Sequence, residues 1–133
     1  MAIRRIPLVV LAAMLLAAPL QAQHRSVRVQ VIDRGQADGI LIRTPNEEWV
    51  VIDAGTNRAQ ADAMRDTWGV DDVALAVVSH RHFDHQGGMD EIIREFDVDL
   101  LVMNSADCPN RTSDDRIRTA ASERNVPFGV GGR

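Results

Sequence analysis

The sequence predicts a layered α/β fold with α+β character, contained in one domain. Three short apolar segments separated by turn residues come first, which indicates neighbouring antiparallel strands. Further apolar segments then alternate with segments of helical periodicity, which is typical of helices packed on a sheet. The length of 133 residues fits no more than one domain.

The three early segments are expected to form an antiparallel meander. Residues 27–33 alternate apolar and polar side chains, the pattern of a half-buried strand. The second and third strands are expected at residues 40–44 and 49–53. Gly39 and Pro45 mark the turns between them, and such short turns join antiparallel strands.

Helices and strands are expected to alternate after the meander. Residues 58–68 predict a helix with Ala59, Ala63 and Trp68 on its apolar side, and Gly69 is well placed to end it. Residues 73–78 are apolar throughout, as expected of a strand buried on both faces. The remaining expected elements are a polar loop over 79–88, a helix over 89–96, a strand over 98–103, a helix over 113–124 and a strand that begins near 126–128.

Residues 1–22 are predicted to be a secretory signal peptide. Two arginines precede an apolar run over residues 6–20, and Ala22 supplies the small residue that signal peptidase requires. The apolar run is shorter than the roughly 20 residues that span a bilayer, so no stable membrane anchor is expected. We therefore expect a secreted or periplasmic protein whose domain covers residues 23–133.

The charge balance gives no support for a nucleic-acid partner. Residues 1–22 hold two arginines and no acidic residue, so the rest of the chain has 13 basic residues against 19 acidic ones. Its formal charge is then −6, compared with −4 for the whole chain. An acidic surface lacks the basic patch that phosphate backbones require, although metal ions could still hold a nucleic-acid substrate. Cys108 is the single cysteine and cannot form an intrachain disulfide.

The residues that carry chemistry lie within six positions of the chain. Three of the four histidines, His80, His82 and His85, follow the apolar run 73–78, and Asp84 stands among them. Because alternate residues of an extended chain point the same way, His80 and His82 can bind one ion together. A curl in the chain would let Asp84 and His85 face a second ion.

Imidazole and carboxylate ligands favour zinc, with iron and manganese as chemical alternatives. One or two such ions would make hydroxide available near neutral pH and would polarise a carbonyl or phosphoryl oxygen. The alternative interpretation is a solvated polar loop in which histidines cluster by accident. The density of histidines directly after a buried strand favours the metal site.

The motif His80-x-His82-x-Asp84-His85, followed by two glycines, resembles the H-x-H-x-D-H signature of the metallo-β-lactamase superfamily. The resemblance implies the N-terminal half of an αββα sandwich with its metal ions at the strand edges. A second likeness is to the opening hairpin of the competence-protein-like (ComEC/Rec2) branch, over residues 35–38, 40–42, 44–45 and 51–55.

The resemblance also implies roles for single residues. His80 and His82 would bind the first metal ion, Asp84 and His85 would bind the second, and Asp84 would also act in catalysis by orienting the nucleophilic water. Asp53 would support the metal-binding loop, and a plain turn role at the end of its strand is the alternative.

The implied function is metal-dependent hydrolysis of an ester, phosphodiester or amide-type bond, in a small-molecule or phosphodiester substrate. The family completes its site with a histidine, a bridging aspartate and a final histidine from its C-terminal half, but no histidine follows His85 here. The chain is therefore expected to be a C-terminally truncated domain without a complete active site. The alternatives are a non-catalytic remnant and a module that a partner chain completes. An exposed edge along residues 98–103 is expected to favour self-association.

Overall fold

The computed structural model describes residues 26–33, 37–104 and 111–131. The predicted signal peptide and Cys108 lie outside the described residues. Within the part that is described, no helix combines the length and the apolar character that a membrane span requires.

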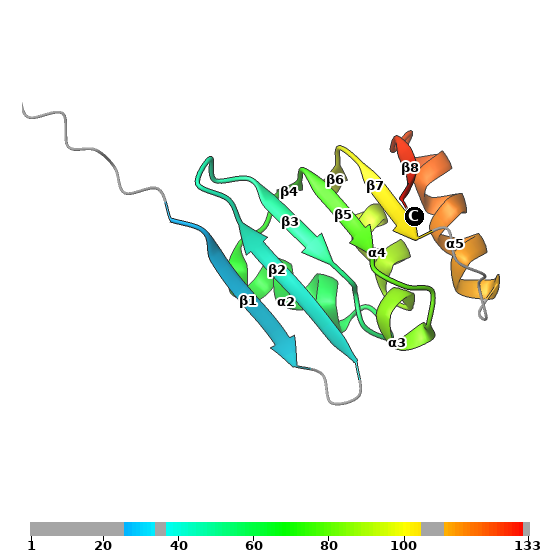
Figure 1. Cartoon of the computed structure of the whole chain (residues 1–133), viewed down its shortest axis with the longest axis horizontal. Coiled ribbons are helices and arrows are strands. Elements are labelled where there is room, and N and C mark those ends of the chain that lie inside the picture. Colours follow the sequence, from blue (N-terminus) through cyan, green and yellow to red (C-terminus); the bar gives the residue numbers. More distant parts are fainter. Residues whose placement is uncertain (1–25, 34–36, 105–110, 132–133) are drawn as a thin grey trace, which may run out of the picture.

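A six-stranded mixed sheet forms the centre of the fold (Figure 1), in the order β1-β2-β3-β5-β7-β8. The first three strands are antiparallel, as the meander pattern predicted, whereas β3, β5, β7 and β8 run parallel. A separate pair of two-residue strands, β4 and β6, is also parallel. The strand bounds are β1 Arg28–Asp33, β2 Asp38–Arg43, β3 Trp49–Ile52, β4 Asp72–Val73, β5 Leu75–Val78, β6 Asp97–Val98, β7 Leu101–Asn104 and β8 Phe128–Gly131.

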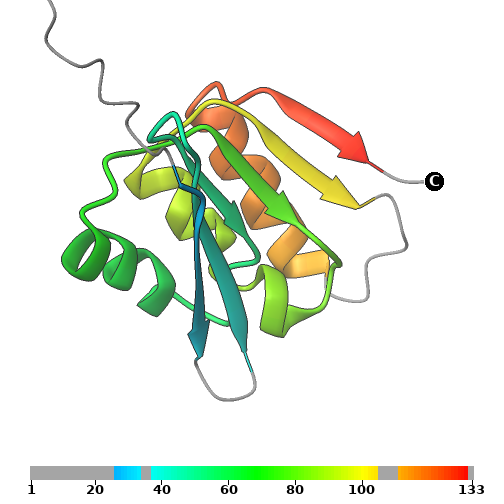
Figure 2. The same cartoon turned by 60° about the vertical axis from the view of Figure 1, so that its left-hand side comes forward.

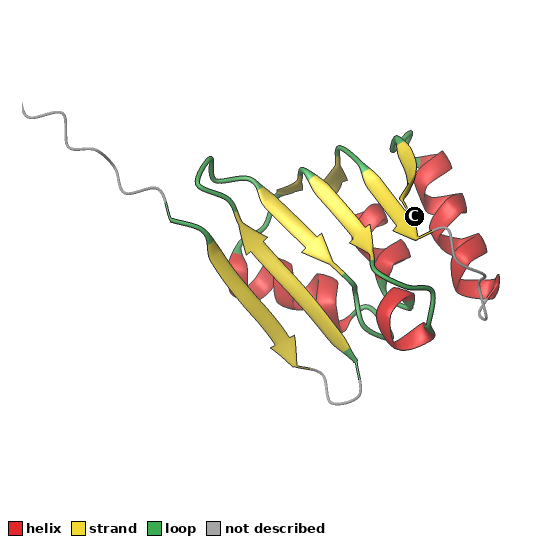
Figure 3. Cartoon of the chain, viewed as in Figure 1, coloured by secondary structure: helices red, strands yellow, loops and turns green. Residues whose placement is uncertain are grey.

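Three helices cover one face of this sheet, and a short fourth helix lies near its carboxyl edge (Figures 2 and 3). The covered face carries the core, in which sheet residues such as Val51 and Leu101 pack with helix residues such as Met64, Ile92 and Ile117. The described part of the molecule therefore has two layers. The helix bounds are α2 Ala59–Trp68, α3 Phe83–Gln86, α4 Met89–Glu95 and α5 Arg111–Glu123.

Helix α2 ends where it was predicted to end, but its buried side differs from the prediction. Gly69 adopts φ 61°, the left-handed conformation that terminates a helix, and its N–H donates to the carbonyl of Met64. The prediction of Ala59, Ala63 and Trp68 as the apolar side was wrong, because Trp68 is exposed. The residues that the helix buries are Gln60, Ala61 and Met64. Met64 offers far more apolar surface than an alanine, which rotates the helix toward it.

An arginine before α2 joins this helix to α4. The Arg58 guanidinium pairs with Asp62 at 3.1 Å and with Glu95 at 2.6 Å. The hydrogen bond to Asp62 and the negative charge of Glu95 raise the pKa of Arg58 above its ordinary value. These contacts hold the two helices beside the loop that follows β3.

The opposite face of the sheet is apolar, and we call it the open face. Strand register and the alternation of side chains place nine aliphatic residues on it. None of the nine is buried, and Val29 and Val31 are 61% and 56% exposed. The valines of the alternating segment 27–33 therefore point away from the helices. The residues of the open face are Val29, Val31, Ile40, Ile42, Val50, Ile52, Leu75, Val77 and Val102.

The prediction of an exposed edge along residues 98–103 was wrong. Val98 belongs to β6, and β7 pairs with β5 on one side and with β8 on the other. The edge strands of the main sheet are β1 and β8. The segment that begins after Pro127 forms a strand as expected, and its pairing with β7 removes that edge.

Two valines of the main sheet, one in β1 and one in β3, test whether the open face is uncovered in solution. Val51 is fully buried, whereas Val31 is 56% exposed. Val51→Ala should lower the free energy of unfolding by roughly 2 kcal/mol, because it removes apolar contact and leaves a cavity. Val31→Ala should change it by less than about 0.5 kcal/mol. Urea unfolding measures both, and equal losses would mean that Val31 is covered in solution.

Candidate metal centre

The candidate site forms where β3 and β5 end. These two strands are parallel neighbours, so their carboxyl ends meet at the same edge of the sheet. Asp53 follows β3 directly and adopts φ 60°, a left-handed conformation that is uncommon for a residue other than glycine. His80 follows β5 by two residues. The turn at Asp53 brings its carboxylate toward the loop after β5.

This loop, residues 79–88, is called the metal loop below. It was predicted to be irregular throughout, but it contains the short helix α3. His82 is extended, with φ −85° and ψ 151°, and the chain turns into α3 immediately after it. Asp84 and His85 lie within α3. This helix is the curl in the chain that was expected to let both residues face one ion.

Two glycines allow the metal loop to pack closely against the loop after β3. A Cβ atom on Gly87 would lie 2.6 Å from the carbonyl oxygen of Phe83 and 2.7 Å from that of Thr56. A Cβ atom on Gly88 would lie 2.3 Å from the carbonyl oxygen of Asn57. Backbone atoms cannot yield at such distances, so these positions exclude any side chain.

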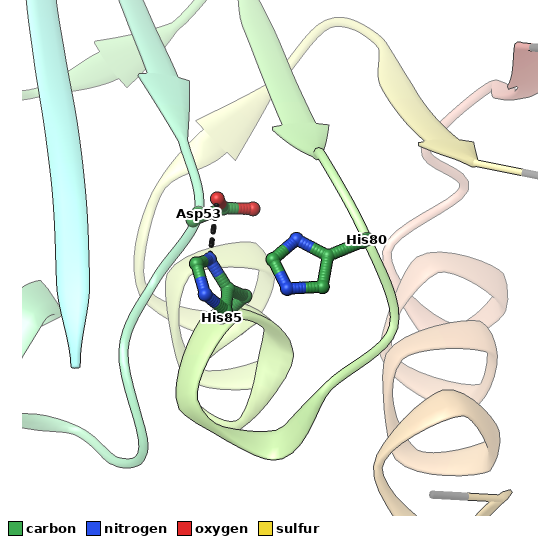
Figure 4. A group of neighbouring side chains, drawn as sticks. All are labelled: Asp53, His80 and His85. Carbon is green, nitrogen blue, oxygen red and sulfur yellow. Dashed lines mark hydrogen bonds and ion pairs between the residues drawn. The ribbon is translucent and has the colours of Figure 1, made fainter. Parts of the chain in front are cut away.

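The buried carboxylate of Asp53 joins the two loops (Figure 4). Its Oδ1 accepts a hydrogen bond from the Ser79 backbone N–H at 2.8 Å, and its Oδ2 accepts one from the Ser79 hydroxyl at 2.6 Å. The same Oδ2 lies 2.8 Å from Nδ1 of His85. Asp53 is 7% exposed, so these bonds stabilise a charge that is largely removed from water. The contacts agree with the supporting role that the resemblance implied for Asp53.

This hydrogen-bond network fixes which nitrogen of each ring can bind a metal. Nδ1 of His85 must carry a proton to bond the carboxylate, which leaves Nε2 with its lone pair. The Ser79 hydroxyl has one proton, which it donates to Asp53, so its oxygen accepts from Nδ1 of His80 at 3.0 Å. His80 therefore also keeps a free Nε2. Asp53 thus sets the tautomer of both rings, directly for His85 and through Ser79 for His80.

The structure brings two of the four predicted ligands, His80 and His85, into one group with Asp53, and neither His82 nor Asp84 belongs to that group. The ring centroids of His80 and His85 are 3.7 Å apart, and those of His80 and His82 are 4.9 Å apart. Asp84 Oδ2 lies 3.7 Å from Nε2 of His85, on the side of the ring that faces away from Asp53. His80 is thus nearer to His85 than to His82, although the sequence interpretation assigned His80 and His85 to different ions.

Asp53 is close enough to serve as a ligand, but its hydrogen bonds argue against that role. One ligand atom each from Asp53, His80 and His85 can be chosen within 4.8 Å of one another. Oδ2 of Asp53 already accepts two hydrogen bonds and Oδ1 accepts one, so the carboxylate is largely engaged by Ser79 and His85. The Nδ1 atoms of His80 and His85 are engaged by Ser79 and Asp53, which leaves the Nε2 atoms as the candidate zinc ligands.

Ser79 is the functional residue that sequence reasoning missed. It was treated as the first residue of a polar loop, although it links Asp53 to His80. Its position immediately before the first histidine, after a buried strand, is the one signal in the sequence. A hydroxyl there is also common in ordinary loops, and the link becomes visible only once β3 lies beside β5.

The structure is an α/β domain with a possible metal-binding group of histidine and aspartate side chains at the carboxyl edge of its parallel strands. The family model of the metallo-beta-lactamase superfamily matches residues 32–125. The chain therefore belongs to the metallo-β-lactamase superfamily, as the H-x-H-x-D-H motif indicated. The search of curated proteins finds no match for it.

Removal of the Asp53 charge should weaken metal binding. Asp53→Asn disturbs the hydrogen bonds that hold both histidine tautomers, so zinc affinity should fall about 10- to 100-fold, the usual effect of losing such a partner. Competition with a chromogenic chelator measures the affinity. Asp62→Asn is the matched control, because Asp62 is an exposed carboxylate that pairs with Arg58. Equal affinities for the two variants would contradict the assignment.

The Ser79 hydroxyl can be tested by a conservative replacement. Ser79→Thr keeps the hydroxyl and should preserve both zinc affinity and the His80 tautomer. Ser79→Ala removes the acceptor for Nδ1 of His80, so the ring should populate both tautomers and bind zinc more weakly. Nitrogen NMR of the imidazoles distinguishes the tautomers in the metal-free chain. An alanine variant whose His80 signals match the wild type would show that Ser79 has no such role.

Proposed function

We propose that this chain is a zinc-dependent hydrolase domain that acts on an ester, phosphodiester or amide-type bond. The observation that carries the proposal is the pair of free Nε2 atoms on His80 and His85, held by Asp53 and Ser79. Bound zinc would supply a water that ionises near neutral pH and a Lewis acid that polarises the scissile group. Iron or manganese could replace zinc with the same ligands.

Four residues of the metal loop have roles in the proposed site. His80, His82 and His85 supply imidazole nitrogens, and the Asp84 carboxylate is both a ligand and the group that orients the attacking water. The position of Asp84 supports this assignment. Its carboxylate is 40% exposed and lies on the Nε2 side of His85, so it can reach both the site and solvent.

The substrate proposed is a small molecule rather than a nucleic acid. Arg81 is the one cation of the metal loop apart from the histidines, and it faces Asp114 with 12% of its side chain exposed. It is therefore engaged within the protein and does not offer its charge to a polyanion. The acidic balance of the chain outside residues 1–22 supports the same choice. A small phosphodiester fits this description.

We further propose that a second β-sheet covers the open face and adds ligands to the site. The face spans five strands, about 20 Å at the usual strand spacing, whereas one helix is about 10 Å wide. A sheet packed face to face suits this surface better than a helix. A catalytic zinc site usually has three protein ligands, and a pair of ions needs more than the metal loop offers. The second sheet would lie on a C-terminal half of the domain or on a partner chain.

Zinc titration of the purified chain tests the proposed function. Wild type should bind zinc, and the variant with His80→Ala and His82→Ala should bind it much more weakly. Binding should also weaken in acid, because metal competes with protons for the imidazoles. The double variant Val29→Ala and Val31→Ala keeps the metal loop intact and serves as control. Indistinguishable binding by wild type and the histidine variant would refute the metal site.

A hydrolysis assay separates an incomplete enzyme from a remnant. The chain alone should hydrolyse lactam, thioester and bis-nitrophenyl phosphate substrates only slowly, and a polypeptide that supplies the second sheet should raise the rate. Asp84→Ala should abolish the gain. A chain that binds zinc but stays inactive with every such polypeptide would favour the non-catalytic remnant. Fast zinc-dependent turnover by the chain alone would show that no further ligands are needed.

We also propose export to the periplasm or the exterior, on the basis of the signal-peptide pattern in residues 1–22. The exported protein should begin at Gln23. N-terminal sequencing of the secreted fraction tests this, and recovery of intact Met1 in the membrane fraction would contradict it.

A further inference from the structure

The side chain of Arg81 points away from the histidines on either side of it. Alternate residues of an extended segment face opposite ways, and His80 and His82 share one side, with ring centroids 4.9 Å apart. On the other side Arg81 meets Asp114 of α5, with its Nε 3.7 Å from Asp114 Oδ1. Both side chains are only 12% exposed. A charged pair thus lies under the segment that carries two of the proposed ligands.

The Asp114 carboxylate is itself held in place by α5. Its Oδ2 accepts a hydrogen bond from Nε of Arg118 at 2.8 Å, one turn further along the helix. The Arg118 guanidinium in turn lies over the ring of Phe128 in β8, 4.7 Å from its centroid. Within the described ranges, neither Nε of Arg81 nor Oδ1 of Asp114 has a hydrogen-bond partner. Asp114 is also compensated by Arg118, whereas the Arg81 charge is compensated by Asp114.

Helix α5 also holds the far end of the metal loop. Nη2 of Arg116 donates to the carbonyl oxygen of Gly87 at 3.0 Å. Within the loop, Nε2 of Gln86 donates to the carbonyl oxygen of Arg81 at 3.0 Å. The loop is therefore anchored on two sides, by Asp53 from β3 and by α5 from the opposite direction.

We propose that Arg81 and Asp114 form a positioning pair for the metal centre, an inference that rests on the proposed function. By fixing the backbone between His80 and His82, the pair sets the separation of the two rings before metal arrives. A preorganised loop loses less conformational freedom on binding, which strengthens binding without any contact to the ion. Neither residue touches the metal or the substrate. Helix α5 thereby controls metal affinity from outside the site.

A purely structural role would give a different result. If the pair only attached α5 to the sheet, its loss would lower stability and leave the affinity of folded molecules unchanged. Zinc affinity and the imidazole NMR signals of the metal-free chain are both measured on folded protein. The imidazole signals require no metal, so they test the pair even if the wild type fails to bind zinc and the proposed function falls.

The experiment uses the full chain with Arg81→Met and Asp114→Asn. Each variant should bind zinc about tenfold or more weakly than wild type, in the range seen when groups that orient metal ligands are lost. The signals of His80 and His82 should shift, while those of His85, held by Asp53, should stay. Asp97→Asn is the matched control, because Asp97 pairs with Arg124 just beyond α5 at 2.8 Å and lies outside the metal loop. It should bind zinc as wild type does.

The inference is overturned if both folded variants keep wild-type affinity and unchanged signals for His80 and His82. If a single variant fails to fold, Arg81→Met with Asp114→Leu removes both charges together and should restore the fold, since a buried pair can often be replaced by apolar residues. This double variant should still bind zinc more weakly, because the loop has lost its tether. Wild-type affinity in the folded double variant would also overturn the proposal.

Discussion

The hydrogen bonds accepted by the Asp53 carboxylate are the interaction on which the rest of the site depends. One buried carboxylate binds Ser79 twice and His85 once, and so ties the end of β3 to the loop that follows β5. It also orients two imidazole rings through their Nδ1 atoms, which leaves both Nε2 atoms free. The parallel pairing of β3 with β5 places the carboxylate at the same sheet edge as the histidines. The parallel pairing of these two strands is therefore the feature of the fold that assembles the site.

The same fold leaves two features that bear on function. Helix α5 covers the metal loop from the side opposite Asp53 and meets it through Arg81 and Gly87. The other face of the sheet carries nine aliphatic side chains, none of which is buried. Apolar surface that extends over five strands is costly in water, since a half-exposed sheet normally carries polar residues on its outer face. The proposed second sheet would both cover this face and supply further metal ligands.

Much of the fold could be predicted from the sequence, because local patterns report local structure. The meander, the helix terminated by Gly69 and the metal-binding motif follow from periodicity, turn residues and the spacing of four side chains. The errors arose where the partner in space decides the outcome. The alternation of residues 27–33 shows that one side is apolar but not whether that side meets helices. The supposed edge at 98–103 depended on whether a later segment pairs with β7, which it does.

For the candidate site too, residues close together in the sequence could be predicted, whereas contacts between distant segments could not. Close spacing along the chain identified the four proposed ligands, and chain geometry required a curl that α3 supplies. Asp53 stood out only by resemblance, since it lies 32 residues from His85 in the sequence. Ser79 and the Arg81–Asp114 pair could not be identified, because their roles depend on hydrogen bonds and burial between distant segments.

A crystal structure of the zinc-loaded chain would test the central claim most directly. We predict zinc about 2.0–2.1 Å from Nε2 of His80 and of His85, the usual zinc–imidazole distance. Asp53 should keep its bonds to Ser79 and His85 and should not touch the ion. Zinc bound to the Asp53 carboxylate, or to Nδ1 of either ring, would contradict the account of how this site is organised.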